Sequence, residues 1–202
     1  MIDIIVQGGA VLWAIMLLSV LAAAIVIERY LYFGRIRTDE DKLFQRIKSA
    51  IAKRHFDEAL AICDSSPSPF SSLLKAGIEY RNRAPYERKE ILKDTAAQEV
   101  PRLERRIGAL GTIAHISPLL GLLGTVTGNI RAFGVLGRFG SISDPSVLAK
   151  GISEALITTA AGLIVAIPAT ILYNMLTSRV NALVTRMENQ VNELTLLLGG
   201  AS

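Results

Sequence analysis

Residues 107–130 read IGALGTIAHISPLLGLLGTVTGNI and carry no formal charge between Arg106 and Arg131. A helix of this length, at about 1.5 Å per residue, crosses the ~30 Å hydrocarbon core of a bilayer with some tilt. The stretch holds glycines, threonines, Pro118 and His115 where a simple anchor holds mostly leucine and valine. Small residues allow the backbones of membrane helices to approach closely. The sequence therefore predicts a membrane span that is packed against other helices.

The composition indicates an integral membrane protein of the all-α class. Half of the 202 residues are apolar and 6% are aromatic. Nothing in the chain shows the roughly ten-residue segments of alternating polarity that build a membrane β-barrel. The net charge of +4 arises from basic residues that alternate with acidic ones. This pattern fits the positive-inside rule of membrane topology better than it fits nucleic-acid binding.

Two further uncharged stretches, residues 10–27 and residues 155–178, are long enough to span a membrane. No Lys or Arg precedes the first of them, which argues against a cleaved signal peptide and for a retained span. Together with the span at residues 107–130, the charge rule predicts an N-terminus outside and a C-terminal helical tail, residues 179–202, in the cytoplasm.

Residues 28–106 are charged, with 17 Lys or Arg against 13 Asp or Glu, and the basic excess beside two spans places them in the cytoplasm. Apolar residues recur at helical spacing in residues 43–51 and 56–63, and the Ser- and Pro-rich residues 65–69 interrupt the pattern. A further helix is expected to begin near Pro69 and to stop before Pro85. The prediction is a small helical lobe.

The second and third spans are predicted to extend far into the cytoplasm as helices. Between Tyr86 and Phe133 the one expected break is Pro101, and a continuous helix there is about 70 Å long. The third helix is expected to begin at Pro145, after an N-cap formed by Ser143 and Asp144, and to run to about residue 198.

One side of each of these two spans is small and weakly polar. On the second span, Gly111, Pro118, Thr125 and Ala132 recur every seven residues, and Gly121 and Gly128 lie beside them on the helix. On the third, helical periodicity aligns Thr159, Thr170 and Thr177 with Gly162 and Ala166. These strips are either helix-packing surfaces or the wall of a shared pore, and their length favours the pore. Gly124 and Gly128 form a GxxxG on another edge that suits close packing.

Titratable groups are scarce in the spans. No Asp, Glu, Lys or Arg lies within any of them, and Glu154 stands at an outer boundary. His115 is the one internal candidate, and a buried neutral histidine bonded to the backbone is the preferred interpretation. If protons cross here, the central carboxylate is expected to come from a partner, because an ionisable group at membrane depth is costly and marks a proton path.

No enzymatic, metal or cofactor site is predicted. No nucleophile, base and orienting group can be assembled around His55 or His115. Cys63 is single, so it cannot form a disulfide within the chain, and it is expected to be reduced and inert.

Four motifs resemble the MotA/TolQ/ExbB proton-channel family over nearly the whole chain. They are PLLGLLGTVTG at residues 118–128, GISEALITTAAGL at 151–163, AIPA at 166–169, and Tyr173-Asn174. Their order, spacing and topology agree with that family. Three spans are typical of the ExbB/TolQ branch.

The resemblance implies a homopentameric ring in the bacterial inner membrane whose second and third helices line a central pore. A dimer of a single-span partner of the ExbD/TolR kind, carrying an essential aspartate, sits in that pore, and a TonB- or TolA-like protein is a further partner. Residues 1–9 and 131–154 are then periplasmic. Proton flow down the proton-motive force drives mechanical work on the cell envelope.

By motif position, the resemblance assigns Thr125 and Thr159 to the pore threonines and Glu154 to the pore-mouth glutamate. His115, Thr127 and Thr158 fall outside the pattern and are taken as structural. The pore wall is expected to include Pro118, Gly121, Gly128, Gly162, Ala166 and Thr170. The alternatives left open are an ExbB-like role in outer-membrane transport, a TolQ-like role in envelope integrity, and a non-conducting membrane scaffold.

Overall fold

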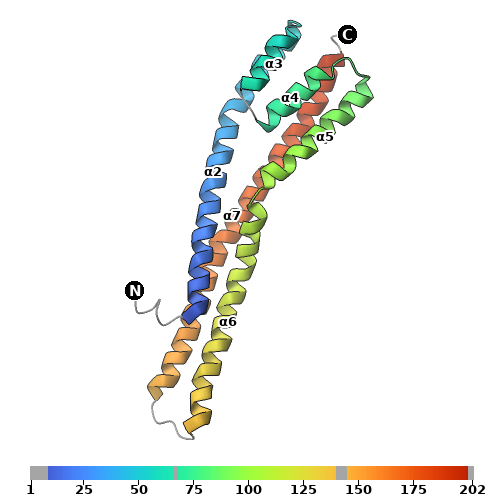
Figure 1. Cartoon of the computed structure of the whole chain (residues 1–202). Helices are drawn as coiled ribbons and strands as arrows, with labels where there is room; N and C mark the ends of the chain where they lie inside the picture. Colours follow the sequence, from blue (N-terminus) through green and yellow to red (C-terminus); the bar gives the residue numbers. More distant parts are fainter. Residues whose placement is uncertain (1–8, 66–67, 140–144, 200–202) are drawn as a thin grey trace. The chain divides into compact units, whose positions relative to one another are not determined.

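The computed structural model describes residues 9–65, 68–139 and 145–199, which form helices and turns without any strand. The helices are α2 (Gly9–Ala52), α3 (Phe56–Ser65), α4 (Pro69–Glu79), α5 (Pro85–Glu104), α6 (Ile107–Phe139) and α7 (Pro145–Gly199), labelled in Figure 1. Three segments are long and apolar enough to cross a membrane: Gly9–Gly34, Ile107–Gly134 and Leu148–Glu193. The predicted all-α class with three spans is confirmed, and the predicted spans lie within these segments.

The chain divides into two compact units, each built from segments far apart in the sequence. We call Met1–Glu28 with Arg106–Leu176 the span unit, and Arg29–Arg105 with Thr177–Ser202 the charged unit. The helices α2 and α7 contribute residues to both units.

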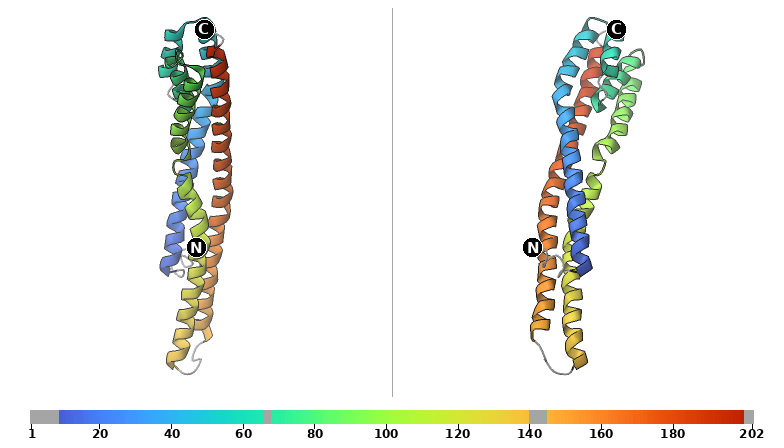
Figure 2. Two further views of the ribbon diagram at one scale, coloured as in Figure 1. Left: turned by 90° about the vertical axis from the view of Figure 1, so that its right-hand side faces the viewer. Right: turned by 60° about the vertical axis from the view of Figure 1, so that its left-hand side comes forward.

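In the span unit, α6 and residues 145–176 of α7 lie side by side, and the views of Figures 1 and 2 agree on this. Its buried residues include Leu12 and Ile15 of α2, Leu110 and Ile113 of α6, and a line of alanines on α7. Many leucines and isoleucines on the other faces are exposed in the single chain. Such faces are suited to lipid or to neighbouring chains.

The first helix does not end after its span. The separate helix that the sequence predicted at residues 43–51 is the end of α2, which runs unbroken from Gly9 to Ala52. It stops in a Schellman-type turn, because the His55 amide donates to the Ala50 carbonyl at 2.9 Å while Arg54 takes a φ of 60°. The charged residues after the first span therefore belong to the same helix as residues 43–51, a continuity that the apolar periodicity did not predict.

The predicted break at Pro101 is wrong, and the chain breaks at Arg105 and Arg106 instead. Pro101 lies inside α5 on an exposed side of the helix, where the carbonyl that it leaves unpaired can be hydrated. Arg105 has an extended ψ of 130°, and Arg106 has a φ of 64°. The buried Arg29 side chain donates to the Arg102 and Leu103 carbonyls at 3.4 Å. A cation thus binds carbonyls that the end of α5 leaves without helical partners.

As a result, the long helix predicted from Tyr86 to Phe133 is two helices, and the second span begins directly at Ile107. The long helices are those of the first and third spans. The third begins at Pro145 and ends at Gly199, as expected. Its predicted N-cap residues Ser143 and Asp144 lie outside the described residues.

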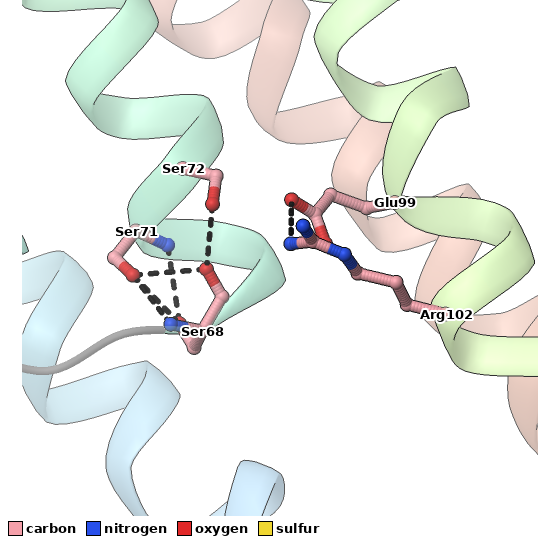
Figure 3. Close-up of polar contacts among 5 residues, drawn as sticks. All are labelled: Ser68, Ser71, Ser72, Glu99 and Arg102. Carbon is pink, nitrogen blue, oxygen red and sulfur yellow. Dashed lines mark hydrogen bonds and ion pairs between the residues drawn. The ribbon is translucent and has the colours of Figure 1, made fainter.

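In the charged unit, α4 packs against α3 and α5. Its start is fixed by a capping box, drawn in Figure 3: the Ser71 amide donates to Ser68 Oγ at 3.1 Å, and the Ser68 amide donates to Ser71 Oγ at 2.6 Å. On the neighbouring α5, Glu99 pairs with Arg102 at 3.1 Å. Pro69 at the first turn and the turn before Pro85 agree with the sequence prediction.

Two contacts hold the end of α7 within the charged unit. Arg88, 2% exposed, donates to the Arg81 carbonyl and to the Thr195 carbonyl, both at 3.0 Å. Lys48 of α2 pairs with Glu193 at 2.7 Å. The Arg88 contact matters more for stability, because a buried guanidinium without hydrogen-bond acceptors is costly. The half-exposed Lys48–Glu193 pair contributes little.

Cys63 yields a first prediction. It is 3% exposed, and burial, reinforced by the charge of Asp64, raises the pKa of its thiol to about 11 from 9.0. At pH 8 the thiolate fraction is then on the order of one in a thousand, against roughly one in ten for an unperturbed thiol. We expect iodoacetamide to alkylate the native protein about 100-fold more slowly than the urea-unfolded chain at this pH. Mass spectrometry of quenched samples measures both rates, and equal rates would contradict the assignment.

Candidate functional site

The helices α6 and α7 meet along a ladder of small residues in the span unit. A Cβ added to Gly162 of α7 would lie 2.5 Å from the Ser117 carbonyl oxygen of α6, a distance that real side chains do not reach. A Cβ on Gly124 would collide with the Thr158 side chain, and one on Gly128 would lie 2.9 Å from the Ala155 Cβ. Backbones this close require glycine at the contact.

This ladder shows what the small residues do within one chain. Gly121, Gly128, Gly162 and Ala166, predicted to form a pore wall, are buried in the single chain, and a Cβ on any of the three glycines would contact the facing helix. The expected packing role of the Gly124–Gly128 pair is confirmed, but its placement on another edge is wrong, because both glycines face α7 together with Gly121. A part for the other residues in a pore stays a prediction, and packing within the chain already explains their size.

Thr159 links the two helices by a hydrogen bond. Its hydroxyl donates to the Gly121 carbonyl of α6 at 2.9 Å and lies 3.3 Å from the Ala155 carbonyl of its own helix. The contact is possible because Gly121 has no side chain: a Cβ there would lie 3.0 Å from the Thr159 Cα. The glycine and the threonine therefore act as a pair.

Thr125 lies on α6 at the depth of Thr159. Each threonine directly follows one member of the Gly124–Thr158 contact, so the two lie at one level of the helix pair. The Thr125 hydroxyl donates to the Leu122 carbonyl at 2.6 Å, and the residue is half-buried. Of the other predicted wall residues, Pro118 is half-buried, and Thr170 is exposed with its hydroxyl on the Ala166 carbonyl at 2.8 Å.

Glu154 stands at one end of this helix pair, one turn from Thr158, whose hydroxyl donates to the Glu154 carbonyl at 2.8 Å. Its carboxylate lies 3.3 Å from Nη1 of Arg131 on α6, with the glutamate side chain 20% exposed and the arginine side chain 68% exposed. In the sequence Arg131 marks the limit of a span, and its pairing with Glu154 was not predicted. The signal was present, because Arg131 and Glu154 are the charges that border two spans on the same side.

The three residues taken as structural in the sequence have different surroundings. Thr158 is 1% exposed and fills the space opposite Gly124, and Thr127 bonds to its own helix at the Leu123 carbonyl. His115 Nδ1 lies 2.6 Å from the Gly111 carbonyl, so its bond to the backbone is confirmed. Its expected burial is wrong for the single chain, where the residue is exposed. Among the described residues, no group of three or more His, Cys, Asp or Glu could hold a metal ion.

Comparison with known families places the chain. The model of the MotA/TolQ/ExbB proton channel family matches residues 65–189, more than half of the sequence and all of the ladder. The chain belongs to this family. It is therefore a member of a family of membrane proton-channel subunits, and it carries the small-residue contact of α6 and α7 within the matched region.

Relatives with ExbB and TolQ names are similar to this chain. The ExbB-like biopolymer transport protein 1 of Synechocystis sp. is 36% identical over 88% of this chain and 71% of its own length. The biopolymer transport protein ExbB of Neisseria gonorrhoeae is 32% identical over 78% of this chain and 80% of its own. The Tol-Pal system protein TolQ of Haemophilus influenzae is 44% identical over 50% of this chain and 44% of its own length. The similarity supports the ExbB/TolQ branch without separating its two members.

The ladder predicts which glycines tolerate a methyl group. Gly162→Ala and Gly124→Ala should destabilise the protein by about 1–3 kcal/mol, the usual cost of overpacking, because the added Cβ meets the facing helix. Gly108→Ala is the matched control on α6, since a Cβ there meets nothing within 4 Å. Thermal unfolding in detergent measures all three variants.

The two ladder variants should also differ from each other. Thr158→Gly removes the whole side chain that blocks Gly124→Ala, including the Cβ that would lie 2.6 Å from the added methyl group, and should recover part of the lost stability in the double variant. No side-chain deletion relieves Gly162→Ala, whose obstacle is backbone. Equal melting temperatures for Gly162→Ala and Gly108→Ala would show that the helices do not approach as described.

Proposed function

We propose that the chain is the channel subunit of an inner-membrane complex that converts proton-motive force into mechanical work on the cell envelope. The observation that carries the proposal is the joining of α6 and α7 by the Thr159–Gly121 hydrogen bond at the level of Thr125, with Glu154 at one end of the pair. Hydroxyls at membrane depth beside a boundary carboxylate are suited to a proton path.

The state of the hydroxyls indicates what they can bind. Thr125, Thr159 and Thr170 each donate their proton to a backbone carbonyl, which leaves the oxygen lone pairs as acceptors. An acceptor suits a protonated carboxylic acid, which donates, and offers nothing to an ionised carboxylate. The chain therefore favours the neutral form of a visiting acid at this level.

That acid has to come from another chain, because residues 107–130 and 155–178 contain no Asp or Glu. We assign it to a single-span partner of the ExbD/TolR kind, present as a dimer inside a pentamer of this chain. Exposed apolar faces of the span unit supply surface for contacts between copies. Each proton that moves through 100 mV releases about 2.3 kcal/mol, enough to bias one rotary or rocking step.

The topology follows from charge. Residues 28–106 carry the basic excess and are assigned to the cytoplasm, and residues 179–202, two spans further along the chain, are assigned to the same side. Residues 1–9 and 131–154 are assigned to the periplasm. The proposed site of action is the bacterial inner membrane, with contacts to lipid. A TonB- or TolA-like protein is the proposed recipient of the work, and similarity to both ExbB and TolQ keeps outer-membrane transport and envelope integrity as alternative tasks.

Thr159 provides the decisive test. Thr159→Val should reduce proton flux at least tenfold in vesicles that contain the chain with its partner, since the variant loses both the acceptor oxygen and the bond to Gly121. The complex should still assemble, because hydrogen bonds between membrane helices average only about 0.6 kcal/mol. Thr159→Ser retains the hydroxyl and should retain most of the flux.

Thr112→Val is the matched control. Thr112 is an exposed threonine on α6 whose hydroxyl bonds within its own helix, to the Gly108 carbonyl at 3.1 Å. A flux reading with a pH-sensitive dye and the mass of the purified complex are compared for all variants. Wild-type flux in Thr159→Val with an intact complex would show that Thr159 is not part of the proton path. An intact wild-type complex that conducts no protons would support the non-conducting scaffold instead.

A further inference from the structure

Two lines of exposed residues follow the outward sides of α6 and α7 in the span unit. On α6 the line is His115, Leu122 and Asn129, and on α7 it is Ser153, Ala160 and Ile167. All six residues are exposed in the single chain. Successive members are seven residues apart, a spacing that keeps side chains on one side of a helix with a drift of only about 20°. Each line is therefore a continuous surface along its helix.

The two lines face away from the contact between the helices. Leu122 lies two positions from Gly124, and Ala160 lies two positions from Thr158, so each lies about 160° around its helix from the Gly124–Thr158 contact. The helix pair thus presents one line on each of two nearly opposite sides. Two different surfaces on opposite sides of one subunit suit a head-to-tail contact between copies, the kind that closes into a ring.

The contact within the chain also sets which residues share a depth in the membrane. Gly124 lies against Thr158, and α6 and α7 run in opposite directions. Two positions before Gly124 and two after Thr158, Leu122 is therefore level with Ala160. By the same count Asn129 is level with Ser153. In a ring around the membrane normal each residue keeps its depth in every copy, so these are the pairs that one copy and the next would bring together.

The residues paired in this way are complementary in polarity and in size. Asn129 and Ser153, both polar and both exposed, meet at one level, and amide and hydroxyl side chains hydrogen-bond across membrane helices. One repeat further along, Leu122, which is 58% exposed, meets the small Ala160. A large side chain on one helix therefore faces a small one on the other, as close packing requires.

The third pair accounts for an exposed polar residue in the second span. His115 is exposed in the single chain although its Nδ1 lies 2.6 Å from the Gly111 carbonyl. At its level the α7 line presents Ile167, which is 59% exposed. A histidine exposed to lipid is unfavourable, because polar side chains in spans usually face protein or a water-filled cavity. The pairing would bury His115 between two copies, where the sequence led us to expect a buried histidine.

We propose that the α6 line of one copy packs on the α7 line of the next copy, and that this is the surface through which copies of the chain assemble. The proposal rests on the proposed function, because it names the contact that closes a ring of this chain around its single-span partner.

Disulfide cross-linking in membranes tests the depth register. Two copies with different affinity tags are co-expressed with the partner, and both carry Cys63→Ala to remove the native thiol. One copy carries Asn129→Cys and the other Ser153→Cys. Oxidation should give at least about fivefold more mixed-tag dimer than Asn129→Cys with Ala160→Cys, which is displaced by about 10 Å, beyond the ~4 Å that two Cβ atoms need.

Leu122→Cys provides the reverse control. It should cross-link with Ala160→Cys in preference to Ser153→Cys, because the preferred partner follows the depth. Mixed-tag dimers exclude disulfides within one chain. Equal yields from matched and mismatched pairs, or a cross-link of Asn129→Cys to the single-span partner in place of the other copy, would overturn the proposal.

A size exchange tests the packing of the same contact. Ala160→Phe should leave at least about fivefold less intact complex in detergent, the lower end of what overpacking costs, while the chain itself folds, because Ala160 is exposed in the single chain. Adding Leu122→Ala on the facing line should restore the complex. Ala109→Phe is the matched control, since Ala109 is an exposed alanine about 140° around α6 from Leu122.

The mass of the purified complex measures these variants. An unchanged amount of complex in Ala160→Phe, or an equal loss in Ala109→Phe, would overturn the proposal. Cross-linking and mass do not depend on proton flux, so the proposed function fails separately, if the intact wild-type complex conducts no protons.

Discussion

The close approach of α6 and α7 is the constraint on which the span unit depends. In a membrane, lipid tails are as apolar as leucine, so helices associate through packing and hydrogen bonds and not through a hydrophobic force. Gly162 on the Ser117 carbonyl and Gly124 on Thr158 leave no room for another side chain. Their contact fixes the two helices in register and thereby sets the levels of Thr125, Thr159 and Glu154.

The small residues on these helices were predicted to serve either packing or a pore wall, and the structure shows the packing, while a pore wall stays a prediction. The glycines face the neighbouring helix of the same chain. Thr125 follows Gly124 and lies about 100° around α6 from that contact residue, at the edge of the contact. Thr159 belongs to the contact itself, because its hydroxyl donates to the Gly121 carbonyl of the facing helix.

Much of the fold was readable from the sequence where local signals decide it. Uncharged length identified the three spans, and Pro69 and Pro145 marked helix starts. The break at Arg106 was not readable, because a positive φ at an arginine depends on surrounding structure, and the carbonyls at the end of α5 are bound by Arg29, 74 residues before Leu103. The pairing of Arg131 with Glu154 across 23 positions was missed, although both charges border spans on the same side.

Among the threonines described in the span unit, Thr159 differs in one respect. The hydroxyls of Thr112, Thr125 and Thr158 bond to carbonyls of their own helix, whereas that of Thr159 reaches the facing helix. A hydroxyl on its own helix keeps its bond however the helices move. The Thr159–Gly121 bond exists only while α6 and α7 stay in register, so the residue that we propose as the acceptor for a visiting acid also depends on the helix contact. In the proposed channel, this coupling would transmit a force on the acid to the helix pair.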